Sequence, residues 1–152
     1  MIIGLAAVLS LISFARLPMG GKLSLEMLPI YFFSFRHGWK AGVFAGFIFG
    51  LTLMIIDPMF VHPVQIVMDY PLPFMLVGFA GFFREQMFLG MLVGGAGRFA
   101  CHFISGIVFF GAFAPEGMPV WQYSLIYNSI YLIPQVVISM ILVPVVLKRV
   151  RK

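Results

Sequence analysis

Two residues that can hold or exchange a proton lie in a stretch that otherwise suits a lipid bilayer. The stretch is GRFACHFISGIVFF, residues 97–110, and the two residues are Arg98 and His102. Residues four apart lie on one face of a helix. A cation inside hydrocarbon costs free energy unless a partner compensates it. The spacing therefore predicts a polar site inside a membrane and a partner for Arg98 on a neighbouring segment.

Asp69 is the predicted partner of Arg98. Counting about 1.5 Å per helical residue from the turn at Arg84 places Arg98 and Asp69 at heights of roughly 21 and 22 Å on adjacent antiparallel segments. Opposite charges at one level inside a membrane favour an ion pair. The sequence leaves open whether this pair is purely structural or also frames a site.

Further polar and aromatic residues converge at the outer third of the predicted bundle. Tyr70, Tyr123 and Asn128 fall near the level of His102, and Phe110 lies two turns beyond it. An aromatic-walled pocket with a few fixed polar groups suits an amphipathic small ligand, and a cationic ligand gains from aromatic faces. Two other interpretations stay open: His102 and Asn128 can serve helix packing, and Tyr123 can belong to the interfacial aromatic belt.

Several kinds of chemistry are not indicated. The chain contains no G-x-x-x-x-G-K-[ST] phosphate loop, no H-E-x-x-H metal motif and no G-x-S-x-G nucleophile elbow. A single cysteine rules out an intrachain disulfide. We therefore expect no enzyme activity, no catalytic residue, no metal site and no cofactor. If the chain moves a ligand against a gradient, the energy must come from a partner or an ion gradient.

The composition predicts an integral membrane protein. Of 152 residues, 62% are hydrophobic and only 10% are charged, which is more apolar than a soluble domain of this size can bury. Four of the ten basic residues lie in the last five positions, after an apolar run, as in a cytoplasmic membrane flank. No basic stripe suggests nucleic-acid binding. We expect a single integral membrane domain over residues 1–152.

Six apolar segments suggest an all-α, six-transmembrane-helix bundle. They span residues 2–17, 25–35, 39–56, 64–83, 86–112 and 121–147. The second is too short to cross about 30 Å of hydrocarbon unaided. Basic residues in the short loops at Arg36, Lys40 and Arg84, together with the basic tail, predict that both termini are cytoplasmic.

Glycines recur at helical spacing in two of these segments. Gly42, Gly46 and Gly50 follow one another at steps of four, and Gly90 and Gly94 repeat the step. Such spacing lets helix backbones approach closely inside a membrane. The pattern predicts internal bundle packing, with a partner-binding face as the alternative.

Two stretches, RFACHFISGIVFF and WQYSLIYNS, resemble the thiamine-specific substrate-binding subunits (S components) of energy-coupling factor (ECF) vitamin transporters. The order and spacing of His102, Gly106, Tyr123 and Asn128 carry the resemblance. Upstream, LPIYFFSFRHGWKAG and MDYPLPFMLVGFAGFFR extend it over nearly the whole chain from about Leu17. The six helices and the basic C-terminus fit the family as well.

The resemblance implies a thiamine-binding pocket near the outer face of a prokaryotic cell membrane. Asp69 stands where the family has a ligand-binding glutamate, Phe110 replaces a tryptophan that stacks on the ligand, and Met19-Gly20-Gly21 replaces a loop tryptophan. The implied ligand-binding residues are Asp69, Tyr70, His102, Gly106, Phe110, Tyr123, Ser124 and Asn128.

The resemblance also implies partners and a mode of action. The chain would be a multi-pass subunit of an ABC-type importer, working with a transmembrane coupling subunit and two ABC ATPases that alone use ATP. Ala6, Ala7 and Ser10 would form the docking face on the first helix. Three alternatives are a subunit for another vitamin or a thiamine precursor, a membrane enzyme with His102 and Asp69 as an acid–base pair, and a small channel or scaffold.

Overall fold

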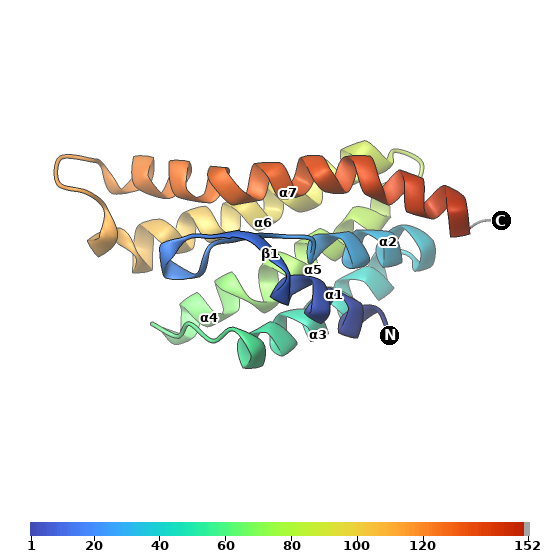
Figure 1. Ribbon diagram of the computed structural model, residues 1–152, viewed down its shortest axis with the longest axis horizontal. Coiled ribbons are helices and arrows are strands. Elements are labelled where there is room, and N and C mark those ends of the chain that lie inside the picture. Colours follow the sequence, from blue (N-terminus) through green and yellow to red (C-terminus); the bar gives the residue numbers. More distant parts are fainter. Residues whose placement is uncertain (151–152) are drawn as a thin grey trace.

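Helices dominate the computed structural model, which describes residues 1–150 (Figure 1). The seven α-helices are α1 (Ile2–Leu11), α2 (Met27–His37), α3 (Trp39–Ile56), α4 (Pro63–Asp69), α5 (Pro71–Phe79), α6 (Met87–Phe109) and α7 (Val120–Val150). Short 3-10 helices and strands complete the described chain: η1 (Pro18–Gly20), η2 (Ala80–Phe83), η3 (Gly111–Phe113), β1 (Ser13–Arg16) and β2 (Lys22–Ser24).

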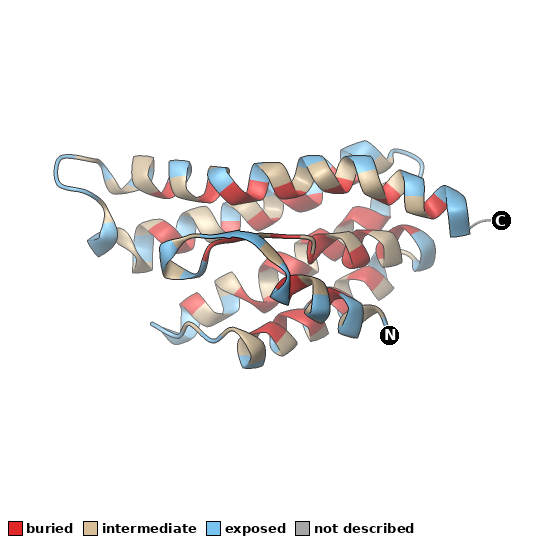
Figure 2. Ribbon diagram, in the orientation of Figure 1, coloured by how far each residue is buried: buried red, intermediate tan, exposed pale blue. Residues whose placement is uncertain are grey.

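Within residues 1–150, four helical segments are long and apolar enough to cross a membrane. These segments are Trp39–Ile56, Pro63–Phe83, Met87–Phe109 and Val120–Val150. The first helix, Ile2–Leu11, is apolar but shorter. Large apolar side chains on the outside of the bundle, such as Ile55 and Phe44, remain exposed, while the faces turned inward are buried (Figure 2). An apolar exterior around a packed interior is the surface that a lipid bilayer requires.

The first predicted helix is shorter than expected. The sequence predicted helix as far as residue 17, whereas α1 ends at Leu11 and residues Ser13–Arg16 form β1. Ile12 is already extended, and the chain turns back through Pro18 and Gly20 so that β1 pairs antiparallel with β2. In Figure 1 the turn of this hairpin lies toward the same end as the loop 111–119, and the two termini lie toward the other end.

The fourth predicted segment is divided at Tyr70. This residue adopts φ −114° and ψ −82°, so α4 ends before it and α5 begins after it. Pro71 explains the break, because proline lacks an N–H and disfavours helical geometry in the residue before it. The break places Asp69 and Tyr70 where two helices meet.

Close helix packing accounts for the glycine repeat. A Cβ on Gly46 would collide with the carbonyl oxygen of Phe74, and one on Gly50 would lie 2.5 Å from Pro71 Cα. Both contacts are made across the α3–α5 interface. The prediction of internal bundle packing is confirmed for α3.

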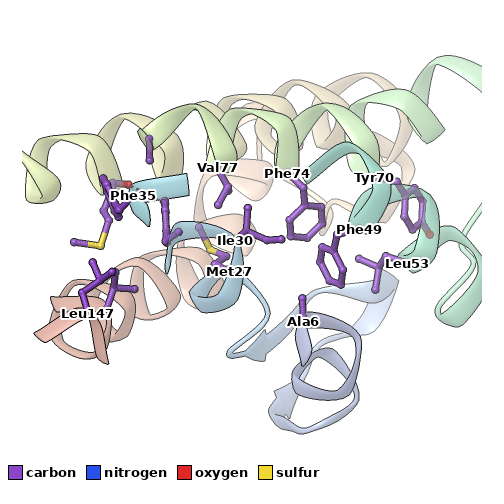
Figure 3. Packing of buried hydrophobic residues seen from close by; sticks show 14 residues of the cluster. Ala6, Met27, Ile30, Phe35, Phe49, Leu53, Tyr70, Phe74, Val77 and Leu147 are labelled. Atoms are coloured by element: carbon purple, nitrogen blue, oxygen red, sulfur yellow. Dashed lines mark hydrogen bonds between the residues drawn. The ribbon is translucent and has the colours of Figure 1, made fainter. Parts of the chain in front are cut away.

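Aromatic side chains fill the centre of the core (Figure 3). Phe49 of α3 and Phe74 of α5 are fully buried and pack edge-to-face at 4.6 Å between ring centroids. Ala6 of α1 packs into the same cluster beside Phe49 and Leu53. This packing contradicts the predicted docking face, because Ala6 and Ser10 are both 0% exposed and Ala7 is only half-buried beside them. Small residues on α1 serve contact with the bundle, and its outward face carries Leu5 and Val8.

Only part of the basic tail falls within the described residues. Lys148 and Arg149 are exposed in the last turns of α7, where cations favour the negative end of the helix dipole. Arg151 and Lys152 lie outside the described residues.

Candidate functional site

A cavity lies between the hairpin, the α4–α5 break, α6 and α7. Its volume is about 110 Å³, counted as the space that the centre of a water molecule can reach. One water needs only about 10–15 Å³ by this measure, so the cavity has room for several. All eight predicted ligand-binding residues line it: Asp69, Tyr70, His102, Gly106, Phe110, Tyr123, Ser124 and Asn128.

Helix α6 contributes one wall of the cavity through residues spaced four apart. Arg98, His102 and Gly106 of α6 line it, as the periodicity of a helix predicts, and Phe110, directly after the last residue of α6, also lines it. At Gly106 a Cβ would collide with Ser124 Oγ on α7. The missing side chain therefore lets α7 approach α6 at the level of the cavity.

Asp69 is held from two sides. Its Oδ1 lies 3.2 Å from Nδ1 of His102, and its Oδ2 accepts a hydrogen bond of 2.7 Å from Nε2 of Gln65. The side chain of Asp69 keeps 14% exposure, and that of His102 keeps 13%. The carboxylate is therefore oriented by the protein while it still faces the cavity.

The predicted ion pair between Arg98 and Asp69 is wrong. Arg98 Nη2 pairs instead with Oε1 of Glu26 at 2.7 Å, and the two side chains are 4% and 0% exposed. Both Asp69 oxygens are occupied by Gln65 and His102, and Glu26 reaches Arg98 from just before α2. Depth counting gives the height of a residue along its helix but not the direction in which its side chain points.

Arg98 has further partners that keep its charge buried. Nη1 donates to Oε1 of Gln135 at 3.3 Å, and Nε donates to Nε2 of His102 at 3.4 Å. The guanidinium also lies 4.4 Å from the ring centroid of Phe74, a cation–π contact. Arg98 thus joins α2, α6 and α7 and connects indirectly to Asp69 through His102.

Lys22 extends the charged network toward the hairpin. Its Nζ lies 3.1 Å from Oδ2 of Asp57 and 3.6 Å from Oε2 of Glu26. Gln135 Nε2 donates to the backbone oxygen of Lys22 at 2.6 Å. Lys22 and Asp57 are 35 positions apart in the chain, and the fold brings them together beside the cavity.

Sequence reasoning missed Glu26, Lys22, Gln65 and Gln135. All four are buried polar or charged side chains. A signal was present for three of them, since Glu26, Gln65 and Gln135 lie within predicted apolar segments, where a polar group needs a partner. No comparable signal marked Lys22, because its burial depends on the hairpin.

Two tyrosines hold the loops around the cavity. Tyr127 OH accepts a hydrogen bond of 2.9 Å from Gly21 N and donates to the Pro18 carbonyl oxygen. On the other side, Tyr70 OH donates to Asp57 O at 2.9 Å and accepts from Met59 N at 2.6 Å. The hairpin is therefore bonded to α7, and the loop after α3 is bonded to the break between α4 and α5.

Asn128 connects α7 with α6. Its Nδ2 donates to Ser124 O at 2.8 Å and to His102 O at 3.3 Å, and its Oδ1 accepts from Tyr131 OH at 2.8 Å. These bonds fix its position in the wall. The helix-packing interpretation of Asn128 is thus confirmed, and the residue lines the cavity as well.

The charges around the cavity are unequal. Lys22 pairs with the carboxylates of Glu26 and Asp57, and Arg98 pairs with that of Glu26. Within residues 1–150, Asp69 forms a salt bridge with neither a lysine nor an arginine, and its charged-group contact is with His102. Aromatic rings of Tyr70, Phe110 and Tyr123 lie around the same cavity. One carboxylate without a permanent cation, set among aromatic rings, suits a cationic aromatic ligand. No cluster of three His, Cys, Asp or Glu side chains within residues 1–150 is arranged for a metal ion.

Comparisons with known proteins agree on one family. The family model described as Thiamine transporter protein (Thia_YuaJ) matches residues 1–152. The Thiamine transporter ThiT of Bacillus subtilis (strain 168) is 39% identical, over 90% of this chain and 81% of its own length. ThiT of Lacticaseibacillus paracasei is 31% identical, over 83% of this chain and 73% of its own length. A solved structure of ThiT from Listeria monocytogenes has a TM-score of 0.87 at 27% identity, covering 97% of this chain and 90% of that one.

Proposed function

Because the chain belongs to the thiamine transporter protein family, we propose that it binds thiamine at the outer face of a prokaryotic cell membrane and serves as the substrate-capture subunit of an importer. The family is one of transporters, so the chain is not an enzyme. Thiamine is the ligand, and it leaves the protein chemically unchanged.

The observation that carries the proposal is that the carboxylate of Asp69 faces the cavity without a lysine or arginine partner among residues 1–150. Thiamine has a permanently positive thiazolium ring joined to an aminopyrimidine. Asp69 is the cavity carboxylate without a lysine or arginine partner in the described chain, and its oxygens are already aimed by Gln65 and His102. A fixed carboxylate stabilises a nearby cation far more strongly in a site that excludes most water than the same carboxylate does in bulk water.

The other cavity residues supply ring stacking and hydrogen bonds to the ligand. Phe110, Tyr70 and Tyr123 offer ring faces for stacking against the two heterocycles. His102 and Asn128 orient the rings by hydrogen bonds, and Gly106 lets Ser124 of α7 come close to α6 in the wall beside the ligand. Asp69, one methylene shorter than glutamate, and Phe110, smaller than tryptophan, leave more space around the ligand than the wider family pattern does.

We propose one integral membrane domain over residues 1–152 with six membrane-embedded segments and both termini cytoplasmic. The segments are α1, α2, α3, α4 with α5 and η2, α6 and α7. Both ends of the chain lie toward one end of the bundle in Figure 1, which supports an even number of crossings. Arg36, Lys40 and Arg84 occur at chain turns, and Lys148 and Arg149 near the C-terminus, as the positive-inside rule requires.

Uptake against a gradient needs an energy source outside this chain. The sequence carries no phosphate-binding loop, so ATP hydrolysis is assigned to partners. We infer that these are the transmembrane coupling subunit and two ABC ATPases of an ECF transporter. Co-purification of those subunits with the tagged chain from its own membranes tests this part of the proposal, and recovery of the chain alone from intact membranes argues against it.

Titration of the purified protein with thiamine tests ligand binding. We expect saturable, submicromolar binding with quenching of intrinsic fluorescence, and at least tenfold weaker binding for Asn128→Ala. Glu116→Ala, in an exposed loop, is the matched control and should bind as the wild type does. Absence of both heat and quenching with thiamine would overturn the proposal. A competition panel of other vitamins and of the separate pyrimidine and thiazole precursors then identifies the ligand.

A further inference from the structure

Ser105 has a buried hydroxyl without a hydrogen-bond partner in the wall of the cavity. The residue is 0% exposed and lines the cavity from α6. Its Oγ makes no hydrogen bond to any described residue. Buried hydroxyls are normally paired, because loss of hydration without a replacement bond costs free energy.

Other hydroxyls on the helices of this protein do find partners. The side chains of five donate to a backbone carbonyl three or four residues earlier, as serine and threonine commonly do in apolar helices: Ser10, Ser34, Thr52, Ser129 and Ser139. Ser124, across the cavity, donates to Phe103 O at 2.8 Å. Ser105 departs from this rule at a position that lines the cavity.

The two other unpartnered buried atoms have different explanations. Oε2 of Glu26 lies 3.6 Å from the ammonium of Lys22, so its charge is compensated without a hydrogen bond. Ser24 belongs to β2 and does not line the cavity. Ser105 alone of the three combines a neutral unpaired hydroxyl with a place in the lining.

The neighbours of Ser105 are already engaged with the protein. His102 faces Asp69 and Arg98, and Asn128 has bonds at both its amide nitrogen and its amide oxygen. Gly106 has no side chain to offer. On this stretch of α6, Ser105 is therefore the cavity-lining residue whose polar side chain has no hydrogen-bond partner among residues 1–150.

We propose that Ser105 is a ligand-binding and specificity-determining residue whose hydroxyl pairs with the polar edge of a nitrogen heterocycle. A hydroxyl can donate to a ring nitrogen or accept from an exocyclic amino group, and it rotates to suit either. Aromatic cavity walls with one such group favour a flat ring that has nitrogen at its edge. This inference rests on the proposed thiamine-binding function and adds a contact to the same site.

The test compares Ser105→Ala with Ser139→Ala. Ser139 is also buried on a helix, but it is bonded to Gln135 O and lies outside the cavity lining. Each purified variant is titrated with thiamine and with analogues that lack the exocyclic amino group or one pyrimidine nitrogen. We expect Ser105→Ala to bind thiamine about tenfold more weakly, the effect of one hydrogen bond. The same variant should lose the wild-type discrimination against one of the analogues, while Ser139→Ala keeps it.

Thermal unfolding without ligand separates recognition from structure. We expect Ser105→Ala to unfold at the wild-type temperature or above, since an unpaired hydroxyl is removed, and Ser139→Ala to unfold earlier. Unchanged thiamine affinity and unchanged analogue ratios in Ser105→Ala overturn the inference, as does a loss of thermal stability equal to that of Ser139→Ala. A wild-type protein that binds no thiamine defeats the proposed function instead, and the unfolding comparison still decides whether Ser105 has a partner within the protein.

Discussion

Glu26, directly before α2, and Arg98 of α6 are separated by 72 positions in the chain and form a buried ion pair of 2.7 Å. The ion pair also affects how His102 and Asp69 are oriented. Arg98 Nε donates to Nε2 of His102, so in a neutral His102 the proton is on Nδ1, which then donates to Oδ1 of Asp69. The orientation of the cavity carboxylate thus depends on a contact with α2.

Glu26→Gln removes the negative partner of a buried arginine. We expect the free energy of unfolding to fall by roughly 3 kcal/mol, because an uncompensated buried charge remains. Thermal and chemical unfolding in detergent measure the loss. The double variant Glu26→Gln with Arg98→Met should recover much of it, since neither charge is left. A single variant as stable as the wild type would contradict the assigned pairing.

Asp69→Asn keeps the size of the side chain and the acceptor for Gln65 but removes the charge. We expect thiamine affinity to fall at least tenfold, because a nearby pair of opposite charges contributes more than about 1.4 kcal/mol at the effective dielectric of such sites. An analogue with an uncharged ring in place of the thiazolium should lose much less. Calorimetric titration of both ligands measures the difference, with Glu116→Gln as the control. Equal losses for the two ligands would mean that Asp69 does not act through charge.

Gly46→Ala tests the close contact of α3 with α5. A Cβ there collides with the Phe74 carbonyl, which is backbone and cannot rotate away. We expect a loss of about 1–3 kcal/mol in stability, as for other overpacked cores. Gly4→Ala is the matched control, because a Cβ on this exposed α1 residue meets nothing within 4 Å. Alanine at that position should stabilise the helix by up to about 1 kcal/mol. Similar unfolding temperatures for the two variants would contradict the packing described for α3.

Met19→Gly relieves an unfavourable backbone conformation at the hairpin turn. Met19 has φ 61°, the left-handed region, and is the one non-glycine residue with positive φ among residues 1–150. A side chain in this region costs about 1–2 kcal/mol. Met59→Gly removes the same side chain from the same cavity without that relief. We expect Met19→Gly to be more stable than Met59→Gly by about 1 kcal/mol in unfolding experiments. The opposite order would show that Met19 side-chain contacts outweigh the backbone strain.

Local patterns predicted much of the helical framework. The segment predicted over residues 39–56 is α3 with the same bounds, and those predicted over 86–112 and 121–147 correspond to α6 and α7 within a few residues. Hydropathy and helical spacing are properties of neighbouring residues, so a single chain reveals them. The same holds for the wall formed by His102, Gly106 and Phe110, which needs only the repeat of a helix.

The β1–β2 hairpin and the pairing of the buried charges could not be predicted from local sequence patterns. Residues 13–16 leave the helix to pair with 22–24, and that choice depends on how the returning strand fits against α7 through Gly21 and Tyr127. Lys22 becomes a buried residue only through this arrangement. Strand pairing and the rotation of helices about their axes are set by contacts between distant segments, which spacing along the chain does not encode.

Sequence alone was sufficient to predict a polytopic helical membrane protein, its thiamine transporter relatives and the eight expected ligand-binding residues, all of which line the cavity. Composition, periodicity and motif order carry those features. The partner of Arg98, the freedom of Asp69 to face a cation and the unpaired hydroxyl of Ser105 depend on tertiary structure. Each of these features depends on which side chains meet between helices. The position of a residue along its helix axis does not determine which neighbouring helix its side chain faces.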